Sequence, residues 1–103
     1  MDLDYVAAAL KELGHPTRLK IYRELVKAGQ TGKPVGELQK KLGIPGSTLS
    51  HHIAALASVG LVKQVREGRV LNCFAQYENL NGIIDFLMDE CCAEQCAEGG
   101  NNE

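Results

Sequence analysis

Residues 43–60 read GIPGSTLSHHIAALASVG, and this stretch determines the predicted fold. Its large apolar side chains recur at spacings of four and three, at Leu49, Ile53 and Leu56. Such spacing is typical of the buried face of an amphipathic helix. Pro45-Gly46 favours a helix start and Gly60 a helix end. The stretch therefore predicts a helix over residues 46–59.

A shorter helix is predicted just before this stretch. The same apolar spacing predicts a helix over Val35–Leu42, which Gly43 ends. The connection to the next helix spans only four residues and contains glycine, which suits two helices that cross steeply. Together the two helices predict a helix-turn-helix motif, in which residues 46–59 form the second helix, the recognition helix.

Further elements are predicted on both sides of the motif. Apolar periodicity predicts helices over Leu3–Leu13 and Pro16–Ala28, and the breakers between residues 30 and 34 predict a loop. After the motif, β-rich segments at 61–65 and 70–74 flank a glycine-containing turn sequence. This pattern predicts a two-stranded hairpin, or wing.

A final helix is predicted to begin at Asn79 and to continue to the cysteines near the C-terminus. The expected fold is thus mainly α with a β-hairpin, a winged helix-turn-helix of about five helices and a two-stranded wing. A chain of 103 residues allows one hydrophobic core. We therefore expect one DNA-binding and dimerisation domain over residues 1–97 and a disordered tail over residues 98–103.

Charge is divided unevenly along the chain. Residues 1–77 hold all eleven lysines and arginines against six acids, whereas residues 78–103 hold seven acids and neither Lys nor Arg. The formal net charge of −2 therefore conceals a basic body that can present positive surface to phosphates. A sequence pI of about 5.9 does not exclude nucleic acid as a partner.

Three separated motifs occur along the chain, which are the run His15-Pro16-Thr17-Arg18-Leu19, residues 44–53, and Arg66-x-Gly68-Arg69 in the wing. Together they resemble the ArsR/SmtB family of metal- and metalloid-responsive repressors, over roughly residues 5–90. The resemblance implies a homodimer, built largely through its first and last helices, that binds operator DNA and leaves it when an inducer binds. Family members commonly carry Ser-Gln where this chain has Pro45-Gly46, so that glutamine contact is absent.

The outer face of the recognition helix is small and polar, which suits insertion into the major groove. The expected DNA contacts on this helix are Ser47, Thr48, Ser50, His51 and His52. His51 is the favoured histidine contact because a rotation of about 100° per residue turns it toward solvent. His52 lies nearer the core edge, where a hydrogen-bonded packing role is an equally good interpretation.

Two arginines flank the tip of the predicted wing, Arg66 and Arg69. We expect them to contact the minor groove or adjacent phosphates, where the potential is negative. A solvated hairpin tip is the alternative interpretation.

Three of the four cysteines lie within six residues, at Cys91, Cys92 and Cys96. If the last helix continues, Cys92 and Cys96 share one face, and a frayed helix end brings in Cys91. Three soft thiolates without a nearby histidine suit trivalent, thiophilic As(III), or Sb(III), as the metal site and inducer. The group also resembles a subgroup of arsenite repressors with a C-terminal Cys-Cys pair. The usual cysteine positions of the best-known arsenic repressors are occupied here by residues 35–38.

Other inducers are open at this stage. Cadmium or lead would also bind soft thiolates, whereas zinc prefers a tetrahedral set that often includes histidine. A thiol redox or persulfide switch is the other alternative, although Asp89, Glu90 and Glu94 oppose thiolate formation. Cys73, on the second strand of the wing, is most simply a small buried hydrophobe.

The sequence contains no nucleotide-binding loop, paired-carboxylate pattern or nucleophile beside a base, so neither an enzyme nor an organic cofactor is expected. The acidic N-terminus lacks the features of a signal peptide, and no window approaches about 18 consecutive apolar residues. We expect a cytoplasmic protein with no membrane partner.

Overall fold

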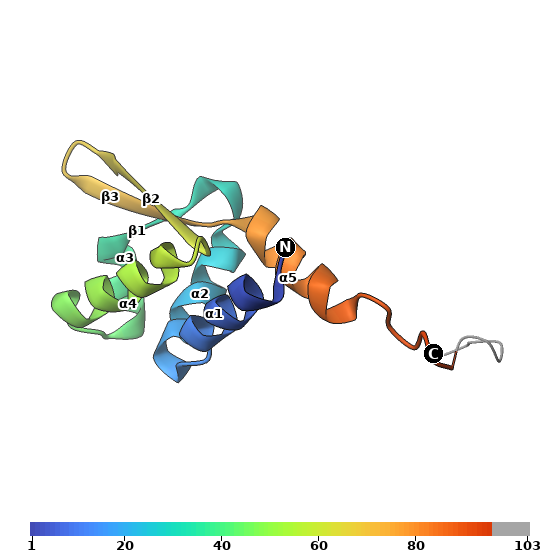
Figure 1. The fold of residues 1–103 in the computed structure, drawn as a ribbon. Helices are drawn as coiled ribbons and strands as arrows, with labels where there is room; N and C mark the ends of the chain where they lie inside the picture. Colours follow the sequence, from blue (N-terminus) through green and yellow to red (C-terminus); the bar gives the residue numbers. More distant parts are fainter. Residues whose placement is uncertain (96–103) are drawn as a thin grey trace.

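Five α-helices and a three-stranded antiparallel sheet make up residues 1–95, the part of the chain that the computed structural model describes (Figure 1). The helices are α1 (Leu3–Leu13), α2 (Pro16–Ala28), α3 (Val35–Leu42), α4 (Gly46–Ser58) and α5 (Tyr77–Met88), with a 3-10 turn, η1 (Gly29–Thr31). The strands are β1 (Lys33–Pro34), β2 (Val62–Glu67) and β3 (Val70–Ala75). The predicted fold class, a winged helix-turn-helix, is confirmed.

Local sequence explains where the first helices begin. The carboxylate of Asp2 accepts a hydrogen bond from the backbone N–H of Tyr5 at 2.8 Å and caps α1. Pro16 occupies the first turn of α2, where its missing N–H costs no helical bond. His15 caps the same helix, because its Nδ1 accepts from the N–H of Thr17 at 3.2 Å.

The turn of the helix-turn-helix depends on one glycine. Gly43 follows α3 with φ of 64°, in the left-handed region that is unfavourable for other residues. The chain then reverses through Ile44 and Pro45 into α4. Leu49, Ile53 and Leu56 of α4 are all buried, as their spacing predicts.

The core lies between the helices and one face of the sheet. Its fully buried large side chains come from α2, α3, α4 and the wing base, and are Ile21, Leu25, Leu38, Leu49, Ile53, Leu56, Leu61 and Cys73. Burial of each leucine or isoleucine stabilises the fold by roughly 1.5–3 kcal/mol relative to exposure. The recognition helix is therefore anchored by its apolar face.

The sheet has one more strand than the sequence predicts. The β2–β3 hairpin runs from the pair Val62–Ala75 to the pair Glu67–Val70, as expected for a wing. Residues 33–34, predicted to be part of a loop, instead form β1, in which Lys33 pairs with Cys73. A two-residue strand is too short to show alternation in the sequence, and its proline is tolerated at a sheet edge.

The prediction that the last helix continues to the cysteines is wrong. Helix α5 begins at Tyr77, two residues earlier than predicted, and ends at Met88. The chain then forms successive turns, with positive φ at Glu90 and Cys92. Residues 89–95 carry no large apolar side chain whose burial would hold a further helical turn. None of the helices in residues 1–95 is long and apolar enough to cross a membrane.

Candidate nucleic-acid interface and thiol pair

The N-terminal half of α4 presents a small polar surface. The side chains of Ser47, Thr48, Ser50 and His51 are all exposed. Pro45 precedes the helix and forms no side-chain cap, so the first N–H groups of α4 are available to an anion. Helix N-termini of this kind favour phosphate oxygens.

His52 occupies a different position from these four residues. Its side chain is only 7% exposed, and its Nδ1 accepts a hydrogen bond from Nε of Arg18 at 3.0 Å. Burial lowers the pKa of His52, and neighbouring His15, Arg18 and His51 lower it further. This environment fits the packing interpretation of His52 better than a groove contact.

Arg18 connects three helices. It donates to His52 of α4 and forms an ion pair with the carboxylate of Glu12 in α1, while it belongs to α2 itself. Sequence reasoning identified Arg18 only within a motif, since its partners lie six residues before it and 34 residues after it.

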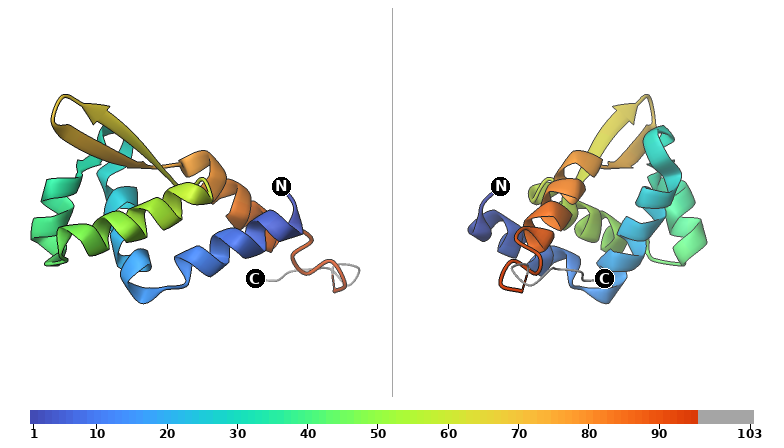
Figure 2. Two further views of the ribbon diagram at one scale, coloured as in Figure 1. Left: turned by 60° about the vertical axis from the view of Figure 1, so that its left-hand side comes forward. Right: turned by 90° about the vertical axis from the view of Figure 1, so that its right-hand side faces the viewer.

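The wing carries exposed positive charge. Arg66 lies near the end of β2 and Arg69 in the two-residue turn at the hairpin tip, and both side chains are exposed. The nearby acid Glu67 accepts from the amide of Asn72 at 2.6 Å. Neither wing arginine has an ion-pair partner within the described residues. Figures 1 and 2 show the wing tip and the beginning of α4 at the same end of the molecule.

An apolar surface lies at the other end, on α1 and α5. Leu3 is 68% exposed and Leu87 59% exposed, and Ile84 and Met88 are also exposed. Met1, which precedes α1, lies against α5 there, because a Cβ atom added at Gly82 of α5 would lie 2.5 Å from Cε of Met1. The chain thus has a basic polar end and an apolar end.

Two of the predicted metal-binding cysteines lie together after α5. The Sγ atoms of Cys91 and Cys92 are 3.4 Å apart; Cys91 is exposed and Cys92 half-buried. The hydrogen bond with Cys91 raises the pKa of the Cys92 thiol, and burial raises it further. The third predicted ligand, Cys96, lies outside the described residues. Within residues 1–95, no group of three His, Cys, Asp or Glu side chains is placed to hold a metal.

Cys73 behaves as the sequence suggests. Its side chain is fully buried between strands and helices, and burial raises the pKa of its thiol to about 11. A protonated thiol in this position packs as a small apolar group.

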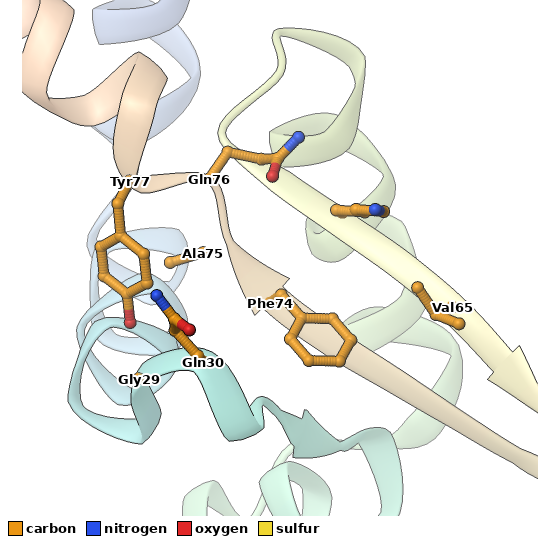
Figure 3. A pocket seen from close by; sticks show the side chains of 8 residues that line it. Gly29, Gln30, Val65, Phe74, Ala75, Gln76 and Tyr77 are labelled. Carbon is orange, nitrogen blue, oxygen red and sulfur yellow. The ribbon is translucent and has the colours of Figure 1, made fainter.

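A hollow of about 250 Å³ lies at the base of the wing (Figure 3). The rings of Phe74 and Tyr77 and the amide of Gln30 border it, and Lys63 supplies the charged group. Its lining contains no acid, histidine, hydroxyl nucleophile or thiol that could form an acid–base or nucleophile–base pair. The phenol of Tyr77 donates to the backbone oxygen of Val26 at 2.9 Å, so its proton is already used in a structural hydrogen bond.

Comparisons with known proteins agree with this geometry. The model of the Helix-turn-helix domain family matches residues 13–65. The chain is 33% identical over 89 residues to the HTH-type transcriptional regulator YgaV of Escherichia coli K12, covering 86% of this chain and 88% of that protein. It is also 33% identical over 90 residues to the Biofilm growth-associated repressor of Agrobacterium fabrum, covering 87% and 74% respectively.

Two solved structures share the fold. An ArsR-like transcriptional regulator from Rhodococcus sp. RHA1 aligns with a TM-score of 0.74 at 25% identity, over 92% of this chain and 86% of that chain. The homodimeric winged helix-turn-helix DNA-binding domain of Mb0332 from Mycobacterium bovis, a possible ArsR-family regulator, aligns with a TM-score of 0.67 at 27% identity, over 97% and 88%.

The fold, the exposed polar helix and these relatives define a DNA-binding transcriptional regulator of the helix-turn-helix class. Within that class, the chain belongs to the ArsR family of winged-helix regulators.

Proposed function

We propose that this regulator is a homodimeric repressor that leaves its operator when As(III), or Sb(III), binds the thiols that follow α5. The observation that carries the proposal is the 3.4 Å separation of the Cys91 and Cys92 sulfurs, at the end of a helix with an exposed apolar face. The proposal has three parts, which concern DNA, the dimer and the inducer.

DNA contacts are assigned to the basic polar end. Ser47, Thr48, Ser50 and His51 would enter or flank the major groove, while the uncapped start of α4 meets a phosphate. Arg66 and Arg69 would contact the backbone or minor groove beside it. His52, predicted from the sequence as a contact, would act from behind this surface.

Dimerisation is assigned to α1 and α5. Their exposed apolar side chains would be costly to leave in water, and a second copy would bury them. The Mycobacterium bovis neighbour is described as a homodimer, which supports the same assembly here. Two recognition helices would then meet two half-sites of one operator.

The geometry of the thiol pair favours a bridging atom over a direct disulfide. No cis peptide bond occurs in residues 1–95, so the Cα atoms of Cys91 and Cys92 lie about 3.8 Å apart across a trans bond. Disulfides usually need Cα separations of about 4.4–6.8 Å. Two thiols whose sulfurs are 3.4 Å apart instead suit one larger thiophilic atom between them, which would displace their protons, with Cys96 as the third sulfur.

The position of the pair relates the inducer to the dimer. The N–H of Cys91 donates to the oxygen of Met88 at 2.9 Å, so the thiols are attached directly to the end of α5. Inducer capture that rearranges this turn would alter the packing of α5 against its partner. To release DNA, the inducer must bind the DNA-free dimer more tightly than the DNA-bound dimer.

A titration of preformed complex tests the proposal. The full chain would be bound to a fluorescent duplex that it has itself selected from a random-sequence library. Arsenite, antimonite, cadmium, zinc and peroxide would then be added separately, with thiols kept reduced except in the last case. We expect release by arsenite and antimonite at the lowest concentrations. Release by peroxide alone would overturn the proposal in favour of a thiol redox switch, and release by cadmium or zinc alone would indicate a different metal.

A further inference from the structure

All three histidines of the chain lie together where α2 meets the recognition helix. The ring centroid of His15, before α2, lies 4.7 Å from that of His52 in α4. The ring of His51 lies 5.7 Å from His52 by the same measure. Arg18 joins this group through its bond to His52 and is held by Glu12 of α1.

The bond between Arg18 and His52 determines the protonation of the imidazole. A guanidinium N–H can only donate, so Nδ1 of His52 must be the acceptor and carries no proton. The single proton of the neutral ring is therefore on Nε2. Arg18 and Glu12 are 15% and 28% exposed, so their ion pair is screened less than a pair at the surface.

This bond differs in kind from the apolar contacts of α4. Leu49, Ile53 and Leu56 attach the helix to the core, but apolar contacts have no directional preference. A hydrogen bond weakens steeply with angle, so it restricts rotation of the helix about its axis. Because Ser50 and His51 directly precede His52, any rotation that breaks the bond also turns the predicted DNA-facing side chains.

We propose that Arg18, oriented by Glu12, is a positioning residue for DNA binding that fixes the rotation of α4 through Nδ1 of His52. The inference rests on the DNA binding proposed above. It assigns a role to residues that touch no DNA, and it connects α1, which carries part of the apolar end, to the recognition helix.

Two pairs of variants test the role. Arg18→Gln and Arg23→Gln each remove one positive charge from α2, but only Arg18 contacts His52. His52→Asn keeps an acceptor at the δ position of the side chain, whereas His52→Gln moves it to the ε position. Glutamine is the better helix former, so helix propensity alone would favour His52→Gln. Affinity for the selected duplex would be measured by fluorescence anisotropy, and folding by circular dichroism.

We expect Arg18→Gln to bind the duplex about tenfold more weakly than Arg23→Gln, the effect of losing one charged hydrogen bond. His52→Asn should stay within about threefold of the wild type, and His52→Gln should resemble Arg18→Gln. Equal affinity of the two arginine variants, or of the two histidine variants, would overturn the positioning role. If Arg18→Gln fails to fold, the comparison of His52→Asn with His52→Gln tests the positioning role. A wild-type chain that selects no duplex would instead refute the proposed function itself.

Discussion

The phenol of Tyr5 in α1 donates a hydrogen bond to the backbone oxygen of Val59, at the end of α4, over 2.5 Å. The bond joins α1, at the apolar end of the molecule, to the C-terminal end of the recognition helix. It supplies a hydrogen bond to a backbone oxygen at a helix C-terminus, which would otherwise have to accept one from water. Together with the bond from Arg18 to His52, it attaches α4 to α1 and α2 at two points.

Tyr5→Phe should lower the free energy of unfolding by about 1 kcal/mol, because it removes this bond and retains the ring. Urea unfolding followed by circular dichroism would measure the change. Tyr77→Phe is a suitable comparison, because its phenol also donates to backbone oxygens, those of Leu25 and Val26. An unchanged unfolding midpoint in Tyr5→Phe would show that the bond contributes nothing.

Leu87→Glu should shift the protein from dimer to monomer. Leu87 is 59% exposed on α5, so a charge there disturbs the proposed interface without entering the core. Sedimentation velocity would report the oligomeric state. Val70→Glu, an exposed apolar position near the wing tip, should leave that state unchanged. Equal dimerisation of both variants would exclude the α5 face as the interface.

Loss of either wing arginine should lower the affinity for the duplex and should also make that affinity less dependent on salt concentration. Each phosphate contact contributes roughly 0.9 to the slope of log affinity against log salt, so Arg66→Gln and Arg69→Gln should each reduce the slope by about 1. Anisotropy titrations at several salt concentrations would give the slopes. A wing that is merely solvated would produce wild-type slopes in both variants.

Stability should fall in acid through His52. Because the pKa of His52 is lowered in the folded protein, the unfolded chain binds more protons in that range and the free energy of unfolding rises with pH. The contribution of His52 is therefore present above its unfolded pKa and lost as the pH falls through its folded pKa. His15, His51 and Arg18 face the ring, and Glu12 is paired with Arg18; all four remain in His52→Asn.

Urea unfolding of the wild type and His52→Asn from about pH 8 to about pH 5.5 isolates this contribution. The wild-type curve should decline more steeply toward acid than that of the variant. Parallel curves would show that protonation of His52 does not oppose folding.

Much of the fold follows from local sequence. The spacing of Leu49, Ile53 and Leu56 predicts α4, and the glycine between two β-rich segments predicts the wing. Both patterns are formed by residues close together in the sequence. Strand β1 was not predicted, since it consists of two residues that pair with a distant strand. The sequence predicts that α5 continues to the cysteines, whereas the helix ends at Met88, after which residues 89–95 have no apolar face to bury.

The candidate site is less accessible to sequence reasoning. Periodicity places Ser47, Ser50 and His51 on the outer face of α4, where the structure has them. Periodicity leaves His52 between the buried and the exposed face of α4. Only its long-range partner Arg18 distinguishes a packing role from a DNA contact. The cysteine spacing predicts Cys92 and Cys96 on one face of a continuing helix, whereas Cys91 and Cys92 lie together in turns after α5.

An arsenite titration shows whether As(III) captured by Cys91 and Cys92 releases the DNA. It would use the duplex complexes of the wild type, of Cys91→Ser/Cys92→Ser and of Cys73→Ala. Duplex release by anisotropy would be recorded beside the ultraviolet absorbance of arsenic–sulfur bonds. The wild type and Cys73→Ala should lose the duplex as the absorbance appears, whereas the double variant should keep its duplex and show little absorbance. Release of the duplex by the double variant at the wild-type arsenite concentration would show that Cys91 and Cys92 do not sense As(III).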